Sequence, residues 1–154
     1  MRFTQRKADP VFDSLEPVVQ GLGMALVDFS VSRHKGSIQI RATVYKAGIV
    51  GVDDCSRVHR AFIPRLELAF PGEDLYVEVS SPGIDRIIKD GSEFVHYLGR
   101  GVKCYRTDIS DWSGGILESA DETRLVLKGK DGLIELKYED IAKAKLDSGS
   151  FDGP

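Results

Sequence analysis

The feature that most constrains the fold is an alternation of apolar and polar residues that fills most of residues 24–45. It runs through residues 24–32, stops at a short segment that contains Gly36, and resumes in residues 38–45. A period of two predicts a β-strand with one buried face, and a short glycine-containing connection favours an antiparallel hairpin. The residues expected on the buried face are Ala25, Val27, Phe29 and Val31 in the first strand and Ile38, Ile40, Ala42 and Val44 in the second.

Helical periodicity lies on both sides of this hairpin. Asp9 and Pro10 combine a good N-cap with a proline at the first helical position, and apolar residues then recur at helical spacing up to Leu22. A second amphipathic helix is expected to begin near Asp53, and a third alternating strand follows in residues 75–80. The order helix, strand, strand, helix, strand predicts an α+β domain with both helices on one face of a three-stranded sheet.

The second half of the chain has a different pattern. After Gly99, short alternating segments are separated by turns rich in Gly or Asp. Five short strands in about fifty residues predict a small barrel. The strands are expected at residues 102–107, 115–120, 124–128 and 133–138, with a last strand that ends at 146. The predicted division is an N-terminal domain at 1–83, ordered from about residue 9, a junction with a short helix at 84–98, the barrel at 99–147 and a mobile tail at 148–154.

Composition excludes several classes of protein. Hydrophobic residues make up 42% and charged residues 29%, which is typical of a globular chain. No apolar run approaches the roughly 18 residues of a membrane span, so no membrane partner is expected. Cys55 and Cys104 stand far apart without metal-ligand spacing, which favours reduced thiols in the cytoplasm and no metal or other cofactor. The 21 basic and 24 acidic residues give a net charge of −3, so any RNA contact must come from a local basic face or through a protein partner.

Four segments resemble the bacterial ribosome maturation factor RimP family. The most specific is residues 75–86, where a strand rich in Val and Glu continues into the sequence SSPGIDR. The other three, at residues 16–28, 52–58 and 140–146, agree in order and spacing. Together they extend the resemblance over roughly residues 11–146.

This resemblance implies an N-terminal α/β domain joined to an SH3-like (Sm-like) barrel. It also implies a non-catalytic assembly factor for the small (30S) ribosomal subunit, which binds the immature subunit through 16S rRNA and a small-subunit ribosomal protein and uses no small-molecule substrate. The alternative is a general Sm-like module that binds single-stranded RNA. No paired carboxylates, His/Cys constellation or phosphate-binding loop supports an enzyme, so no catalytic residue is predicted.

Two faces of the N-terminal domain are candidates for contact with RNA or the ribosome. On the outward face of the sheet, Arg41 and Tyr45 combine a cation with an aromatic ring, as RNA-binding sheets do. The alternative, which we favour, is that this face is the solvated side of the sheet or a seat for the barrel. On the second helix, Arg57 and Arg60 share one exposed side, and Arg33 is expected nearby at the hairpin tip. Such arginines either straddle phosphates or are simply solvated.

The barrel supplies further candidates. Lys103 is expected to point outward from its strand, and Lys143 and Lys145 lie on the last segment. Small barrels bind RNA or protein tails through such edges. Trp112 is expected in a loop, either as an exposed anchor for a partner or as a lid on the barrel core.

The junction between the domains is expected to be either a partner contact or a hinge. In the first interpretation Arg86 presents its guanidinium to RNA or to a carboxylate of a partner, and Asp85 orients it. In the second, which we favour, both side chains bond to the backbone and fix the junction next to a rigid Pro-Gly turn. The residues assigned to this junction are Ser80, Ser81, Pro82, Gly83, Asp85 and Arg86.

Overall fold

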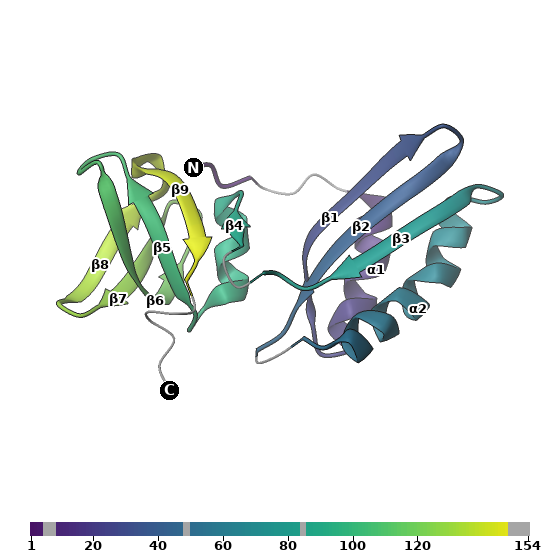
Figure 1. Cartoon of the computed structure of the whole chain (residues 1–154), viewed down its shortest axis with the longest axis horizontal. Helices are drawn as coiled ribbons and strands as arrows, with labels where there is room; N and C mark the ends of the chain where they lie inside the picture. The colour runs from purple at the N-terminus through teal and green to yellow at the C-terminus, as the bar shows by residue number, and fades with distance from the viewer. Residues whose placement is uncertain (5–8, 48–49, 84–85, 148–154) are drawn as a thin grey trace. The chain divides into compact units, whose positions relative to one another are not determined.

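The structure is a computed structural model that describes residues 1–4, 9–47, 50–83 and 86–147. The chain is an α+β protein with one three-stranded and one six-stranded sheet (Figure 1). It divides into two compact units. One consists of residues 6–82, and the other consists of residues 83–154 together with residues 1–5. Residues 1–5 fall within the predicted N-terminal domain but group with the C-terminal unit. The predicted domain limits stay predictions, and the tail at 148–154 lies outside the described residues.

The N-terminal unit has the predicted order of elements. These are α1 (Pro10–Gly21), β1 (Ala25–His34), β2 (Ser37–Tyr45), α2 (Val52–Ala69) and β3 (Asp74–Ser80). The sheet order is β1-β2-β3, in which β1 and β2 form the predicted antiparallel hairpin and β2 and β3 run parallel. Both helices lie against the same face of this sheet, as predicted (Figure 1).

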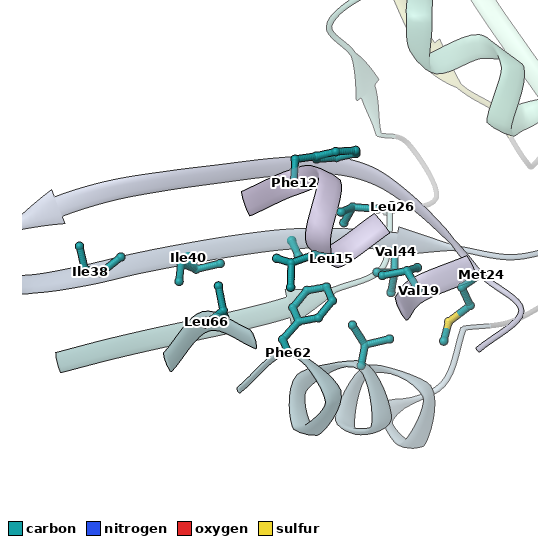
Figure 2. Packing of buried hydrophobic residues seen from close by; sticks show 12 residues of the cluster. Phe12, Leu15, Val19, Met24, Leu26, Ile38, Ile40, Val44, Phe62 and Leu66 are labelled. Carbon is teal, nitrogen blue, oxygen red and sulfur yellow. The ribbon is translucent and has the colours of Figure 1, made fainter. Parts of the chain in front are cut away.

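The helices and β2 share one hydrophobic core (Figure 2). The predicted face of β2 is confirmed, because all four of its apolar residues are buried. Phe62 of α2 and Leu15 of α1 are completely buried within this cluster. The buried core residues are Phe12, Leu15, Val19, Met24, Leu26, Ile38, Ile40, Ala42, Val44, Val58, Phe62 and Leu66.

Local capping explains where α1 begins and ends. The Asp9 carboxylate accepts hydrogen bonds from the backbone N–H groups of the first turn, as its position before Pro10 predicted. At the other end Gly23 adopts φ +81°, and the Met24 N–H donates to the Val19 carbonyl at 3.1 Å. This left-handed ending turns the chain back so that β1 starts beneath the helix.

The predicted faces of β1 are wrong at its beginning because of a β-bulge at Val27. Leu26 pairs with Val44 and Asp28 pairs with Thr43, so Val27 is an extra residue on its strand. An extra residue exchanges the two faces of a strand. Leu26 is therefore the buried residue, at 1% exposure, in place of Ala25 and Val27. Further along, Val31 is also exposed, at 39%, although it was expected on the buried face.

The C-terminal unit is built on the six-stranded sheet. Its strands are β4 (Ile87–Ile88), β5 (Gly101–Arg106), β6 (Asp111–Ala120), β7 (Arg124–Gly129), β8 (Gly132–Lys137) and β9 (Ile141–Leu146). Two short 3₁₀ helices, η1 (Gly91–Tyr97) and η2 (Tyr138–Asp140), lie between them. The strand order is β4-β9-β5-β6-β7-β8. Within the described ranges the edge strands β4 and β8 do not pair with each other, so the sheet does not close. The SH3-like barrel therefore stays a prediction.

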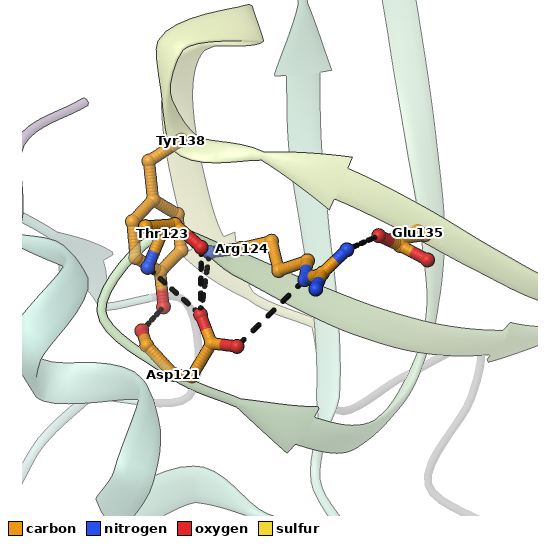
Figure 3. Close-up of polar contacts among 5 residues, drawn as sticks. All are labelled: Asp121, Thr123, Arg124, Glu135 and Tyr138. Atoms are coloured by element: carbon orange, nitrogen blue, oxygen red, sulfur yellow. Dashed lines mark hydrogen bonds and ion pairs between the residues drawn. The ribbon is translucent and has the colours of Figure 1, made fainter.

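A network of hydrogen bonds fixes the turn between β6 and β7 (Figure 3). The Asp121 carboxylate accepts from the N–H groups of Thr123 at 2.8 Å and Arg124 at 2.9 Å, which lowers the pKa of Asp121. The Tyr138 hydroxyl donates to the Asp121 carbonyl at 2.6 Å, and Arg124 forms an ion pair with Glu135 of β8. These contacts hold η2, β7 and β8 together.

The first residues of the chain lie against the same unit. The Gly91 N–H donates to the Arg2 carbonyl at 2.7 Å, and Thr4 donates to the Asp90 carboxylate from its N–H at 2.9 Å and its hydroxyl at 2.6 Å. A Cβ at Gly91 would lie 2.8 Å from the Tyr138 ring and 3.2 Å from the Arg2 carbonyl oxygen. Only glycine leaves room for this approach.

The packing of the N-terminal unit predicts the cost of emptying its core. Phe62→Ala is expected to lower the free energy of unfolding by about 3–5 kcal/mol, because it leaves a cavity in a closely packed cluster. Leu68→Ala is the matched control on the same helix, since Leu68 is 84% exposed. It should change stability by less than about 0.5 kcal/mol. Urea unfolding followed by circular dichroism measures both, and equal effects would contradict this core assignment.

Candidate nucleic-acid interface

The three lysines predicted from the barrel segment lie together on the outer face of the six-stranded sheet. Lys103 of β5 is directly opposite Lys145 of β9, and Tyr105 is opposite Lys143. Cys104, between the two outward β5 residues, is completely buried, and burial raises its pKa to about 12. Because side chains alternate along a strand, Lys103 and Tyr105 face away from the core.

Trp112 completes this surface. It lies in β6 opposite Tyr105, and the two rings meet edge to face with their centres 5.6 Å apart. The Nζ atoms of Lys103 and Lys145 are 5.3 Å and 5.7 Å from the centre of the Trp112 ring. The prediction that Trp112 lies in a loop is thus wrong, and its position outside the core excludes the lid interpretation. We refer to Lys103, Tyr105, Trp112, Lys143 and Lys145 as the Lys–Trp cluster.

The charges of the Lys–Trp cluster are not neutralised within the part of the chain that the structure describes. No carboxylate there forms an ion pair with any of its three lysines. Like charges directly opposite each other on neighbouring strands repel, as Lys103 and Lys145 do. The negative face of the Trp112 indole offsets part of that repulsion. A bound anion would remove more of it, because it would neutralise both ammonium groups.

The chemistry of the cluster suits a nucleic-acid strand. Ammonium groups neutralise phosphates whatever the base sequence, and an exposed aromatic ring stacks on unpaired bases. Trp112 is 39% exposed, so part of its ring is accessible. A chain with a net charge of −3 requires a local basic face for such contact, and this cluster is one.

Arg57 and Arg60, the predicted cations of α2, differ from the lysines of the Lys–Trp cluster, because Arg57 has an acidic partner. Nη2 of Arg57 donates to Oδ1 of Asp54 at 2.6 Å, and Nζ of Lys46 lies 3.1 Å from Oδ2. A hydrogen bond from the Gly51 N–H, together with Arg57 and Lys46, lowers the pKa of Asp54 to about 2. Arg57 therefore stabilises the start of α2, whereas Arg60 remains exposed.

The outward face of the N-terminal sheet is less suited to RNA than its sequence indicated. The register places Arg41 opposite Glu78, and their Nε and Oε2 atoms are 3.3 Å apart, so this cation has a carboxylate partner. Tyr45 is only 9% exposed and is not accessible for stacking.

Arg33 does not lie near Arg57 and Arg60, contrary to the prediction. It forms an ion pair with Glu73, and its guanidinium carbon lies 6.0 Å from the centre of the Phe70 ring. Phe70 caps the C-terminal end of α2, and a helix rises 1.5 Å per residue, which separates it from Arg57 by about 20 Å along the axis.

In the junction segment, Arg86 is held inside the C-terminal unit. Its Nε donates to Oε1 of Glu93 at 2.7 Å, and the Tyr97 hydroxyl donates to the same oxygen at 3.2 Å. The side chains of this pair are only 13% and 8% exposed. Arg86 is thus engaged with a buried carboxylate that the sequence analysis missed. Its role as a hinge stays a prediction, and Asp85 lies outside the described residues.

Of the other junction residues, Gly83 contacts Arg86 through the main chain, because its carbonyl accepts a hydrogen bond from the Arg86 N–H at 3.1 Å. Ser80 ends β3, and Ser80, Ser81 and Gly83 are exposed. Pro82 is half-buried. The turn expected at residues 81–84 includes position 84, which lies outside the described residues, so this turn stays a prediction.

The fold and the cluster define a two-unit α+β protein with an exposed cationic and aromatic surface on its C-terminal sheet. Residues 14–85 match the RimP N-terminal domain family. Proteins named ribosome maturation factor RimP from Borrelia hermsii (strain HS1 / DAH) and Borrelia turicatae (strain 91E135) are 26% and 27% identical to this chain over 136 residues. The similarity covers 88% of this chain and 93% of each relative. These matches confirm the predicted resemblance to the RimP family.

None of the helices in the described residues combines the length and the apolar content needed to cross a bilayer.

The buried Arg86–Glu93 pair predicts a large effect of removing one partner. Glu93→Ala is expected to cost about 3–5 kcal/mol of stability, because it leaves the Arg86 charge buried without its carboxylate. Glu78→Ala is the control, since the Arg41–Glu78 pair is exposed and is expected to contribute less than about 1 kcal/mol. Fluorescence of Trp112, the single tryptophan, follows unfolding of the C-terminal unit for the first variant, and circular dichroism serves for the second. A loss below about 1 kcal/mol for Glu93→Ala would contradict a buried ion pair.

The low pKa of Asp54 predicts a specific dependence of stability on pH. Its pKa is about 2 in the folded chain against an ordinary value of 3.8, so its ion pairs stabilise the fold above about pH 4. That contribution is lost as the pH falls from about 4 to about 2. The difference in stability between the native chain and Asp54→Asn should therefore shrink over this interval. Denaturant unfolding at several pH values measures it, with Asp53→Asn as the neighbouring control, and a constant difference would refute this role of Asp54.

Proposed function

We propose that this chain is a ribosome maturation factor that binds the immature small (30S) subunit in the cytoplasm and promotes its maturation without catalysing a reaction. The RimP N-terminal domain and the relatives named ribosome maturation factor RimP support a role in ribosome maturation. The observation that carries the RNA-binding part of the proposal is the Lys–Trp cluster, where two unneutralised lysines, Lys103 and Lys145, lie at the ring of an exposed tryptophan and a third, Lys143, is opposite Tyr105.

In this proposal the cluster contacts 16S rRNA. The lysine ammonium groups bind backbone phosphates, and the exposed part of Trp112 stacks on an unpaired base. A small-subunit ribosomal protein is the second proposed partner. Because a maturation factor must leave the finished particle, it has to bind the immature state more tightly. Unpaired bases that later become paired would supply that difference, since Trp112 can stack only on a base that is free.

The same cluster favours a second candidate function, a general Sm-like module for single-stranded RNA. The two functions differ in what they require of the target. A general module binds bare oligonucleotides tightly with a steep dependence on salt, because phosphate contacts supply nearly all of its affinity. A maturation factor of net charge −3 prefers the precursor subunit and binds bare RNA weakly.

Charge reversal on β9 tests the proposed interface. Lys143→Glu/Lys145→Glu is expected to lower affinity for purified precursor small subunits by at least about tenfold, because two phosphate contacts become repulsions. Lys130→Glu/Lys137→Glu is the matched control, with the same charge change on exposed residues of the β7–β8 hairpin. Co-sedimentation with precursor subunits measures both. Equal losses of affinity in the two variants would show that the net charge of the chain, and not the Lys–Trp cluster, determines binding. Tight binding of a bare oligonucleotide by the native chain would favour the general RNA-binding module.

A further inference from the structure

We propose that β3 and α2 form a groove that binds an extended segment of a partner protein, which adds to the N-terminal sheet as a fourth strand and places a carboxylate next to Arg60. This site lies within the unit formed by residues 6–82, whereas the Lys–Trp cluster belongs to the other unit. The inference goes beyond the proposed function and does not rest on it.

The first observation is the free edge of β3. The sheet order is β1-β2-β3, and β3 pairs with β2 without interruption from Asp74 to Ser80. Along those seven residues the other side of the β3 main chain has no strand partner in the described ranges. An unpaired edge offers alternating N–H and C=O groups to another extended chain.

This edge has only part of the usual protection. Proteins commonly prevent pairing at a sheet edge with charged side chains, especially lysine, with proline or with a β-bulge. The sequence of β3, DLYVEVS, contains the exposed acids Asp74 and Glu78 but neither lysine nor proline, and its register with β2 is regular. The opposite edge strand, β1, carries the bulge at Val27. Of the two edges of this sheet, β3 is therefore the one suited to accept a strand.

The second observation is a surface groove beside that edge. On its β3 side Val77 and Val79 point toward the helix layer and supply an apolar floor, while Glu78 between them is exposed. Val52 of α2 is 83% exposed within it. An added strand would direct every second side chain onto this apolar floor. The groove is lined by Val52, Cys55, Ser56, His59, Arg60, Val77, Glu78 and Val79.

Charge identifies the occupant. Arg60 lines the groove and forms no ion pair within the described residues, whereas Glu78 on the opposite side is paired with Arg41. The groove therefore has one uncompensated cation above an apolar floor, and an acidic side chain complements it. A second copy of the chain would bring another uncompensated Arg60 to the same face, so like charges would approach. A segment of a different protein, with alternating apolar residues and one Asp or Glu, has no such conflict.

Peptide selection on the full-length chain tests the proposal. A displayed library of random decapeptides is expected to yield binders with alternating apolar residues and an acidic residue. Arg60→Glu should lower the affinity of the chain for the selected synthetic peptide by at least about tenfold. Arg65→Glu, at an exposed position on the same helix, should leave that affinity within about twofold of the native value. The same peptide with N-methyl groups at alternate residues should lose binding, because strand addition depends on main-chain hydrogen bonds.

Cys55 provides an independent readout inside the groove. It is half-buried there, whereas Cys104 is completely buried in the other unit. Bound peptide should slow modification of Cys55 by N-ethylmaleimide in proportion to occupancy. The Lys143→Glu/Lys145→Glu variant should bind the peptide normally, which separates this site from the proposed function. Recovery of no binders, equal binding by Arg60→Glu, or self-association of the chain through β3 would each overturn the proposal.

Discussion

The contacts of two lysines with the face of Trp112 are the interaction on which the functional account depends. Pairing of β5 with β9 places Lys103 directly opposite Lys145, an arrangement that costs free energy through repulsion. The indole ring lies within 6 Å of both ammonium groups and offsets part of that cost. The residual positive charge remains available, because no described carboxylate neutralises it. A surface that is electrostatically unfavourable in the free chain gains most from an anionic partner.

The two units contrast in how they use their cations. In the N-terminal unit, arginines mainly pair with acids of the same unit, as Arg57 does with Asp54 and Arg41 with Glu78. These pairs support the start of a helix and the register of two strands. In the C-terminal unit, the lysines of the Lys–Trp cluster have no such partners among the described residues. RNA contact is accordingly proposed for the C-terminal sheet, and strand addition for the free edge of the N-terminal one.

Local signals predicted much of the fold. The alternation in β2, the cap at Asp9 and the glycine turn of the hairpin each depend on neighbouring residues, and all three are present. The bulge at Val27 is not predictable from the sequence, because one extra residue does not alter the apolar appearance of a short segment. It does exchange which side chains of the strand face the core. The Asp, Ser and Gly neighbours of Trp112 predict a loop, yet pairing with β5 makes this residue part of a strand. In the Lys–Trp cluster, the outward direction of the lysines is predictable from the alternation along each strand. The position of Lys103 opposite Lys145 depends on the pairing of β5 with β9, which are distant in sequence, and a single sequence does not reveal that pairing.

Fluorescence of Trp112 tests the central claim most directly, because it is the single tryptophan of the chain and lies at the centre of the proposed interface. Titration of the native chain with purified precursor small subunits, excited at the red edge of indole absorption, reports whether the ring contacts RNA. The account predicts strong quenching of the emission by precursor subunits and much weaker quenching by mature subunits at the same concentration. Binding of precursor subunits with no change in Trp112 emission, or equal quenching by mature subunits, would contradict it.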